Sequence, residues 1–249
     1  MAVEVGCDDD VATRWMWDRS AASASSCETQ NLRIGMEDYR VVKDTKTSMQ
    51  GDSKFIDQQS GMKIWESSCD LVAYMQNLKT TNNWSVTTKV LEIGCGHGLP
   101  GIFTLLSGAS VHLQDYSKNT LQQYTSANIA LNQGLAKNDK KLQDVTFWSG
   151  EWKNVCVKML EEGLKFDVIL CAECIYNEEQ YAEILYLLEK LLAKKGFALV
   201  AGKRFYFGCS GGTAGFLDAV SEPLCGEEIW VSEDGMSNVR EILKIQYKK

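Results

Sequence analysis

The feature that most constrains this chain is a glycine-rich turn directly behind a short apolar run, in the stretch KVLEIGCGHGLPGI at residues 89–102. Four of the eight residues from Gly94 to Gly101 are glycines. Closely spaced glycines between a strand and a helix let the backbone approach a ligand, as in nucleotide-binding α/β sheets. The turn therefore predicts a strand over Val90–Ile93, a helix after Pro100 and a nucleotide-like ligand at their junction.

Two glycine patterns overlap in this turn, and they predict different cofactors. Counted from Gly96, the residues fit the dinucleotide pattern G-x-G-x-x-G. That pattern places its first glycine just after the strand, whereas this strand ends at Ile93. Glu92 followed by glycines at 94, 96 and 98 needs no such shift, and it is the acidic residue and glycine loop of an S-adenosylmethionine (AdoMet) site. The strand boundary therefore favours AdoMet over a nicotinamide dinucleotide.

A carboxylate follows the next predicted strand, Val111–Leu113. This is Asp115, in the run Gln114-Asp115-Tyr116, seventeen residues beyond Gly98. A carboxylate at this place can accept hydrogen bonds from both hydroxyls of a ribose. Asp115 therefore predicts a nucleoside ligand without choosing between the two cofactors.

Alternating strand and helix patterns extend on both sides of the turn. Before it, apolar residues at helical spacing from Ile64 to Met75 predict an amphipathic helix. After it come the patterns of a helix over Thr120–Asn132, strands over Val145–Trp148 and Phe166–Cys171, a helix over Glu178–Ala193 and a strand over Phe197–Ala201. The last of these helices is predicted to end in a left-handed cap at Gly196.

Two further predicted strands, Glu228–Val231 and Ile242–Tyr247, are joined by a turn around Gly235. They predict an antiparallel end to the sheet. We therefore predict an α/β fold, namely a seven-stranded, Rossmann-like sheet of the class I methyltransferase type. It is expected to be mostly parallel with an antiparallel last strand and to be flanked by helices.

The first part of the chain has a different composition. Residues 1–57 are rich in Ser, Ala, Thr, Asp and Gln and have few periodic apolar positions, so we predict a largely irregular N-terminal extension. Within it, Trp15 and Trp17 could pack locally and Tyr39–Val42 could add a strand. Residues 58–249 are predicted to form the AdoMet-dependent domain.

The net charge and the cysteine content limit which binding partners and which cellular compartment are expected. The net charge of −7 and the pI near 5.0 argue against non-specific nucleic-acid binding and suit a basic protein partner. Nine cysteines without regular spacing, no signal sequence and no apolar run of membrane-spanning length predict a protein of the cytoplasm or nucleus that is not secreted. Cys171 and Cys174 form a C-x-x-C without a second such pair, so no metal site is predicted.

A set of short runs between Gly61 and Gly212 carries a more specific signal than the turn. They are, in order, Ile64-Trp65-Glu66, Gln114-Asp115-Tyr116, Ser149-Gly150-Glu151-Trp152, Glu173-x-x-Tyr176-Asn177 and the later KRFYFG. In these runs the chain resembles the histidine protein methyltransferase family, which belongs to the seven-strand protein methyltransferases that modify lysine or histidine. The resemblance implies an AdoMet-dependent protein-histidine N-methyltransferase. It also implies a large-subunit ribosomal protein as substrate, because the family's known target is a histidine of ribosomal protein L-three.

The resemblance and the glycine turn together imply a set of cofactor-binding residues. In that set Trp65 would cover the cofactor, Glu151 would accept from the adenine amino group and Trp152 would pack on the ring. The full set is Ile64, Trp65, Glu66, Ser67, Ser68, Glu92, Gly94, Cys95, Gly96, Gln114, Asp115, Tyr116, Gly150, Glu151, Trp152 and Ala172. The chain departs from the family at Ala172, where a serine is frequent, and at Cys209-Ser210, in a loop that is usually richer in glycine.

The predicted catalytic residues, Glu173, Tyr176 and Asn177, follow the buried strand and lie where open α/β sheets bind ligands. Methyl transfer needs a lone pair on the acceptor and no metal, and imidazole, with a pKa of about 6.5, is mostly neutral near pH 7. The enzyme must then fix one tautomer by accepting the N–H of the nitrogen that does not attack. Glu173 or Asn177 could do so, and aromatic faces of Tyr176, Phe205 or Tyr206 could stabilise the cation.

Other functions share part of this pattern. A lysine methyltransferase of the same fold would show the same Glu-x-x-Tyr motif. A nicotinamide-dependent oxidoreductase and a non-catalytic AdoMet-binding partner protein also remain open. An enzyme that methylates amino groups of nucleic acids is disfavoured, because it needs an Asn/Asp-Pro-Pro-aromatic loop and the only prolines here are Pro100 and Pro223.

Overall fold

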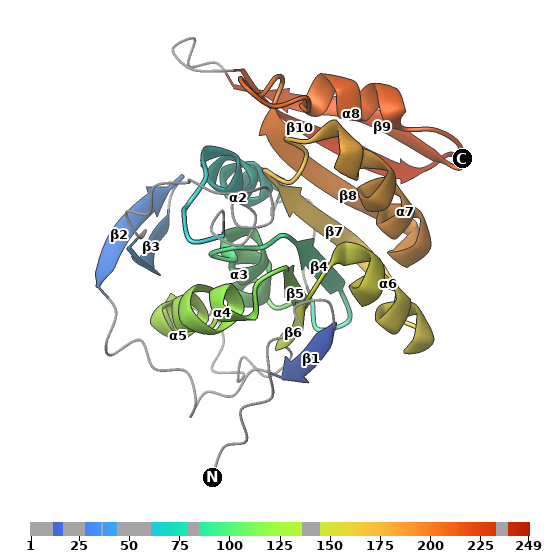
Figure 1. The fold of residues 1–249 in the computed structure, drawn as a ribbon. Helices are drawn as coiled ribbons and strands as arrows, with labels where there is room; N and C mark the ends of the chain where they lie inside the picture. Colours follow the sequence, from blue (N-terminus) through green and yellow to red (C-terminus); the bar gives the residue numbers. More distant parts are fainter. Residues whose placement is uncertain are drawn as a thin grey trace.

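A twisted sheet with helices on both faces forms the centre of the molecule (Figure 1). The computed structural model describes residues 12–16, 28–35, 37–43, 61–78, 85–135, 145–232 and 239–249. The strands of this sheet are β1 (Thr13–Met16), β4 (Lys89–Ile93), β5 (Ser110–Asp115), β6 (Val145–Ser149), β7 (Phe166–Ala172), β8 (Leu192–Lys203), β9 (Leu224–Val231) and β10 (Arg240–Tyr247). Their order across the sheet is β1-β6-β5-β4-β7-β8-β10-β9.

The sheet is parallel in its centre and antiparallel at two places. Strands β6, β5, β4, β7 and β8 pair in parallel, whereas β10 is antiparallel to both β8 and β9. This confirms the predicted mostly parallel sheet with an antiparallel last strand. The strand count differs, because β1 adds an eighth strand where seven were predicted. It pairs antiparallel with β6 and covers what would otherwise be an open edge.

The two faces of the sheet bury separate apolar cores. One core is covered by α2 (Glu66–Leu78), α3 (Leu99–Leu106) and α5 (Ser126–Asn132), and the other by α6 (Trp152–Glu161), α7 (Tyr181–Leu191) and α8 (Thr213–Ala219). Short turns complete the helical part: α4 (Lys118–Thr120), a π-helical turn (Leu121–Thr125) and two 3₁₀ turns (Gln133–Leu135, Glu178–Gln180). Along β4, Val90 faces the first core while Leu91 and Ile93 belong to the second. Helices α6 and α8 were not predicted from the sequence.

One predicted helix end is wrong. The helix ends at Leu191 and β8 begins at Leu192, so Gly196 lies inside a strand and is not a left-handed cap. The glycine is needed there for another reason. A Cβ at Gly196 would lie 2.6 Å from the carbonyl oxygen of Asp167, so the missing side chain lets β8 approach β7 where their register shifts.

The N-terminal residues that the structure describes are more regular than predicted. Besides β1, they form an antiparallel hairpin of β2 (Thr29–Ile34) and β3 (Glu37–Val42), which confirms the strand predicted at Tyr39–Val42. The hairpin is held to α5, because the side chains of Asn128 and Asn132 accept the backbone N–H groups of Val42 and Arg40. Trp17 and the turn at Gly235 lie outside the described residues, and the boundary at residue 57 stays a prediction. Among the described helices, none has the length and apolar character to cross a membrane.

Candidate functional site

A single cavity of about 670 Å³ collects most of the predicted site residues at the carboxyl ends of β4, β5, β6 and β7. Its volume lies within the ~300–1,000 Å³ range of small-molecule sites. The predicted residues on its wall are Ile64, Trp65, Ser68, Glu92, Gly94, Cys95, Gly96, Gln114, Asp115, Tyr116, Gly150, Glu151, Trp152, Ala172, Glu173 and Tyr176.

The glycine turn forms one wall of this cavity in a backbone conformation that favours glycine. Gly94, Gly96 and Gly98 have φ angles of 57°, 50° and 72°. At Gly94 space is limiting as well, since a Cβ would lie 2.4 Å from the Sγ of Cys174. The turn is therefore open to a ligand on one side and closely packed on the other.

Glu92 is buried at the base of the turn. Its Oε2 accepts the backbone N–H of Gly101 in the first turn of α3 at 2.7 Å, which satisfies one of the amides that a helix N-terminus leaves without a partner. Burial raises the pKa of this carboxyl group to about 8, although the bond from Gly101 opposes the shift. Glu92 lines the cavity, but its main contact anchors the helix that begins there.

Asp115 holds the turn from the neighbouring strand. Its Oδ2 accepts the N–H of Gly96 and its Oδ1 accepts the N–H of Ser117, both at 2.9 Å. Burial raises the pKa of Asp115 to about 6, against the effect of these two bonds. An ionised carboxylate has about four acceptor positions, so hydroxyl groups of a ligand can still donate to it.

Gln114 ties three parts of the wall together. Its Oε1 accepts from the backbone N–H of Gly94 at 3.0 Å and from Nε1 of Trp152 at 2.9 Å. Its Nε2 donates to the carbonyl oxygen of Gly150 at 2.8 Å. Gln114 was predicted as a cofactor contact. In the structure its side chain connects the glycine turn to the loop after β6.

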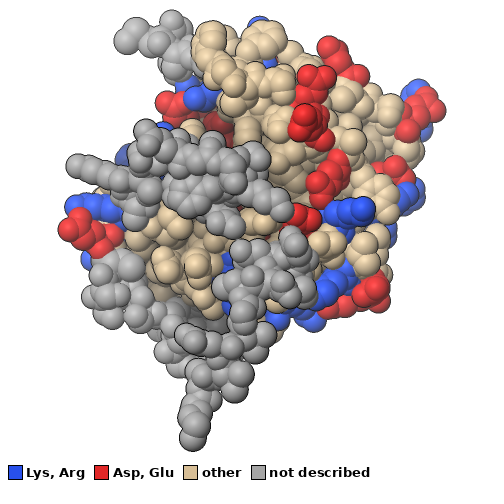
Figure 2. Space-filling model, in the orientation of Figure 1, with Lys and Arg blue, Asp and Glu red and all other residues tan. Residues whose placement is uncertain are grey.

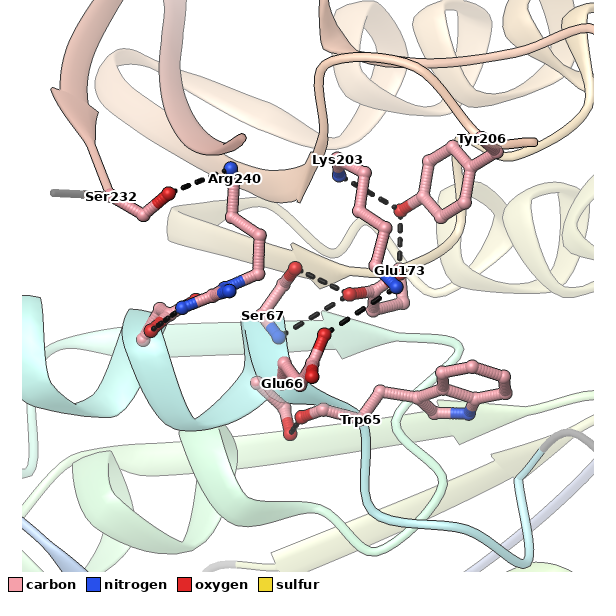
Figure 3. A network of polar contacts seen from close by, with 10 residues as sticks. Trp65, Glu66, Ser67, Glu173, Lys203, Tyr206, Ser232 and Arg240 are labelled. Atoms are coloured by element: carbon pink, nitrogen blue, oxygen red, sulfur yellow. Dashed lines mark hydrogen bonds and ion pairs between the residues drawn. The ribbon is translucent and has the colours of Figure 1, made fainter. Parts of the chain in front are cut away.

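Glu173 also lines the cavity and is held at both carboxylate oxygens (Figure 3). Its Oε1 accepts from the hydroxyl group of Ser67 and from the Ser67 backbone N–H at 3.3 Å, and its Oε2 accepts from the hydroxyl group of Tyr206 at 2.6 Å. It is the one described non-glycine residue with a positive φ, 61°. A strained backbone that is held this firmly is typical of functional sites.

The residues that bind Glu173 are themselves fixed by further polar contacts. The hydroxyl group of Tyr206 accepts the backbone N–H of Lys203 at 3.2 Å, and the Nζ of Lys203 lies 3.4 Å from Oε2 of Glu66. Burial and the charge of Glu173 raise the pKa of Tyr206 well above its ordinary value, so this phenol stays protonated and donates. Ser67 lies in the first turn of α2, where the positive end of the helix dipole favours a carboxylate.

Three predicted site residues do not line the cavity. Glu66 pairs with Lys203, and Ser67 lies behind Glu173 and bonds to it. The Oδ1 of Asn177 accepts from the backbone N–H of Glu179 at 3.0 Å, so this side chain caps the turn over Glu178–Gln180.

The cavity also has lining residues that the predicted set lacks. Tyr206 is predicted from sequence only as an aromatic face, whereas its hydroxyl group binds Glu173. The run KRFYFG was a usable signal for Lys203, Tyr206 and Phe207, and the glycine turn for residues 97–99, whereas no predicted motif marks the other lining residues. The residues concerned are Gly61, Lys63, His97, Gly98, Leu99, Cys174, Gln180, Glu183, Lys203, Tyr206, Phe207 and Cys209.

Known proteins share this fold. A putative methyltransferase solved in complex with SAH superposes with a TM-score of 0.62 at 10% identity, covering 90% of this chain and 57% of that chain. The magnesium protoporphyrin IX methyltransferase of Synechocystis, with bound SAH, gives a TM-score of 0.54 at 16% identity, over 80% of this chain and 90% of that chain. The fold is therefore that of the class I methyltransferases, as predicted.

Sequence comparison identifies the family. A family model described as lysine methyltransferase matches residues 45–219. The histidine protein methyltransferase 1 homolog of Dictyostelium discoideum is 36% identical over 76% of this chain and 59% of that protein. The homolog of Bos taurus is 37% identical over 66% of this chain and 49% of that protein, so the chain spans about half the length of these relatives. Because the model covers more than half of the chain, the chain belongs to the protein methyltransferase family that this model describes, with histidine protein methyltransferase homologs among its relatives.

Proposed function

We propose that this protein is an AdoMet-dependent protein-histidine N-methyltransferase. The observation that carries the proposal is that the glycine turn, Asp115 and Glu173 all line one cavity. Such a cavity can hold a cofactor against the first two and an acceptor side chain against the third.

The residues present fit AdoMet. Its nucleoside would be held by the Asp115 carboxylate, with Glu151 and Trp152 near the base, and its methionine part by the backbone of the glycine turn at Gly94. The turn suits a ligand part that carries no phosphate. Its amides at Gly94 and Gly96 already donate to Gln114 and Asp115, so they are not available to bind phosphate oxygens. When bound, AdoMet supplies a methyl group from a positively charged sulfonium.

The acceptor side chain would lie beside Glu173. A neutral imidazole, the main form near pH 7, needs no base before it accepts a methyl group. Glu173 retains acceptor capacity beyond the bonds from Ser67 and Tyr206, so it can accept the N–H of the ring nitrogen that is not methylated. This contact would fix the tautomer and stabilise the imidazolium that forms. Tyr176 and Tyr206, whose ring centroids lie 6.3 Å apart, would face the developing charge.

A lysine acceptor is the second candidate, since the matching family model is described as lysine methyltransferase. A lysine ammonium, with a pKa of about 10.4, must lose a proton before it can react. Glu173 is poorly placed to be that base, because both its oxygens already accept hydrogen bonds, from Ser67 and from Tyr206. These contacts and the names of the relatives favour histidine.

The proposed substrate is a basic protein, and a large-subunit ribosomal protein is the expectation from the family resemblance. The net charge of −7 suits such a partner. The decisive experiment incubates the protein with tritiated AdoMet and a ribosomal-protein extract and analyses the amino acids of each labelled band. Label in methylhistidine supports the proposal. Label in methyl-lysine supports the second candidate, and AdoMet binding without any label would indicate a non-catalytic binding protein.

A further inference from the structure

The loop after β8 holds two phenylalanine side chains in solvent at the mouth of the cavity. Phe205 is 64% exposed and Phe207 is 87% exposed, and Phe207 forms part of the cavity wall. Tyr206 lies between them in the chain, and its hydroxyl group points to Glu173 (Figure 3). Large apolar side chains that are exposed together next to a ligand site mark interaction surfaces.

These phenylalanines are exposed on a loop that is firmly held. The N–H of Gly211 donates to the carbonyl oxygen of Tyr176 at 2.9 Å, and the N–H of Tyr206 donates to the carbonyl oxygen of Gly211 at 3.2 Å. The hydroxyl group of Tyr181 bonds to the backbone of Gly212. The exposed rings therefore stand on a preorganised support, which lowers the entropy lost when a partner binds.

Acidic side chains lie beside this loop. Glu178 and Glu179 are exposed, and the N–H of Glu178 donates to the hydroxyl group of Ser210 in the same loop at 3.1 Å. Among the described residues, no ion pair involves either of these two glutamates. Glu151 and Glu183 line the cavity. Figure 2 shows several acidic side chains in a row down the face of the molecule that it presents.

We infer that Phe205 and Phe207, together with Glu178 and Glu179, form the docking surface for a basic segment of the protein substrate next to the methylated side chain. The inference rests on the proposed function and specifies how its substrate is recognised. The two rings supply apolar contact area, and the glutamates attract Lys and Arg side chains and set the orientation. Phe205 lies outside the cavity wall, so its ring serves a partner that extends beyond the cavity.

The test compares the double variant Phe205→Ala/Phe207→Ala with the unaltered protein. Initial rates are measured with tritiated AdoMet at increasing concentrations of a ribosomal-protein extract. The double variant is expected to raise the half-saturating extract concentration about tenfold, because exposed aromatic anchors dominate such interfaces. The Kd for AdoMet and the Tm are expected to stay unchanged. Tyr186→Ala, an exposed aromatic residue on α7 outside the cavity wall, is the matched control and is expected to change none of these.

Two charge comparisons sharpen the test. Phe207→Lys is expected to raise the half-saturating concentration more than Phe207→Glu, because both changes remove the ring but only lysine repels a basic segment. Glu178→Gln/Glu179→Gln is expected to raise it about threefold at low salt, with little difference from the unaltered protein at high salt, since salt screens exposed charges. Glu161→Gln, an exposed glutamate on α6, is the control.

The outcomes separate this inference from the proposed function. If the unaltered protein labels a protein but the phenylalanine double variant saturates like the Tyr186→Ala control, the docking surface is overturned while the activity stands. Equal effects of Phe207→Lys and Phe207→Glu would overturn the basic character of the partner. If the unaltered protein labels no protein at all, the proposed function fails and the docking surface fails with it.

Discussion

The two walls of the cavity are built in different ways. The turn wall, which comprises residues 92–117, brings its contacts from one short stretch of chain, with Glu92 on Gly101 and Asp115 on Gly96. The Glu173 wall joins Ser67, Glu173 and Tyr206, which are separated by 106 and 33 residues. A local pattern is enough to form the first wall, whereas the second exists only when α2, β7 and the loop after β8 have packed together.

This difference suggests a division of labour. The turn wall fixes backbone amides and the carboxylate of Asp115, which we propose to bind the nucleoside of the cofactor. The Glu173 wall fixes the carboxylate that we propose to contact the acceptor, and it would then decide which group is methylated. Substitutions in the turn wall should therefore alter cofactor affinity, and those in the Glu173 wall should alter turnover.

The largest effect is expected from Glu173→Gln. Glutamine must place an NH₂ group against either Ser67 or Tyr206, both of which donate, so the side chain loses its fixed position. We expect turnover to fall about 100-fold, at the upper end of the loss for one hydrogen bond to a charged group, with AdoMet affinity changed by less than about twofold. Rates with tritiated AdoMet and calorimetric titration measure the two quantities, and Glu161→Gln is the control. Full turnover in Glu173→Gln would remove the proposed orienting role.

The next effect tests the turn wall. Asp115→Asn leaves one oxygen to serve the N–H groups of both Gly96 and Ser117, and it removes the charge that accepts from the ribose. We expect the Kd for AdoMet to rise about 30-fold, as for the loss of a hydrogen bond to a charged group, while turnover at saturating AdoMet is kept. A fall in turnover at saturation without a change in Kd would contradict the division between the walls.

A smaller effect is expected from the residues that hold Glu173. Tyr206→Phe and Ser67→Ala each remove one donor to the carboxylate, and we expect each to lower turnover about fivefold to tenfold. The double variant should approach Glu173→Gln, because the carboxylate then loses both hydroxyl partners. Tyr186→Phe, which removes an exposed hydroxyl group on α7, serves as the control. Unchanged turnover in all three variants would show that Glu173 needs no fixing.

The smallest effect concerns stability and pH at Glu92. Its folded pKa of about 8 lies above the ordinary value of 4.5, so between these values the folded state binds a proton that the unfolded state has lost. Stability of the unaltered protein should therefore decrease as pH rises through this window, by at most about 1.4 kcal/mol per pH unit from this group. Glu92→Gln lacks this contribution and can still accept from Gly101. Its Tm relative to the unaltered protein should rise from pH 5 to pH 8, and a constant difference would exclude the buried proton.

The turn wall could be predicted from the sequence because its contacts are short in range. The strand end at Ile93 and the carboxylate of Asp115 near the end of the next strand were visible as local patterns, and parallel strands necessarily bring their carboxyl ends to one edge. A local pattern gave the wrong prediction at Gly196. The residues there have the composition of a helix end, but Gly196 lies inside β8 because the strand approaches β7 closely. Local patterns report local conformation and not the neighbours of a residue.

The Glu173 wall was predicted only in part. Its position after a buried strand was readable, but Ser67 was predicted as a cofactor contact and Asn177 as a catalytic residue. In the structure Ser67 donates to Glu173, and Asn177 caps the turn over Glu178–Gln180. The contact of Ser67 depends on a partner far away in the chain, as does β1, whose four residues carry no periodic signal and pair with β6 across up to 136 residues. The cap at Asn177 is local, but the sequence alone did not distinguish it from a catalytic role.

The position of β10 has a consequence for how the sheet is assembled. It lies between β8 and β9, although it follows both in the chain. Strand β9 therefore has no neighbour in the sheet until β10 is in place, and the strands cannot be added in the order in which they are synthesised. The simplest order forms the β9–β10 hairpin first, a local step of about 1–10 μs, and then docks its β10 edge onto β8. Until that docking, the free edge of β8 is open to any other chain that offers a strand.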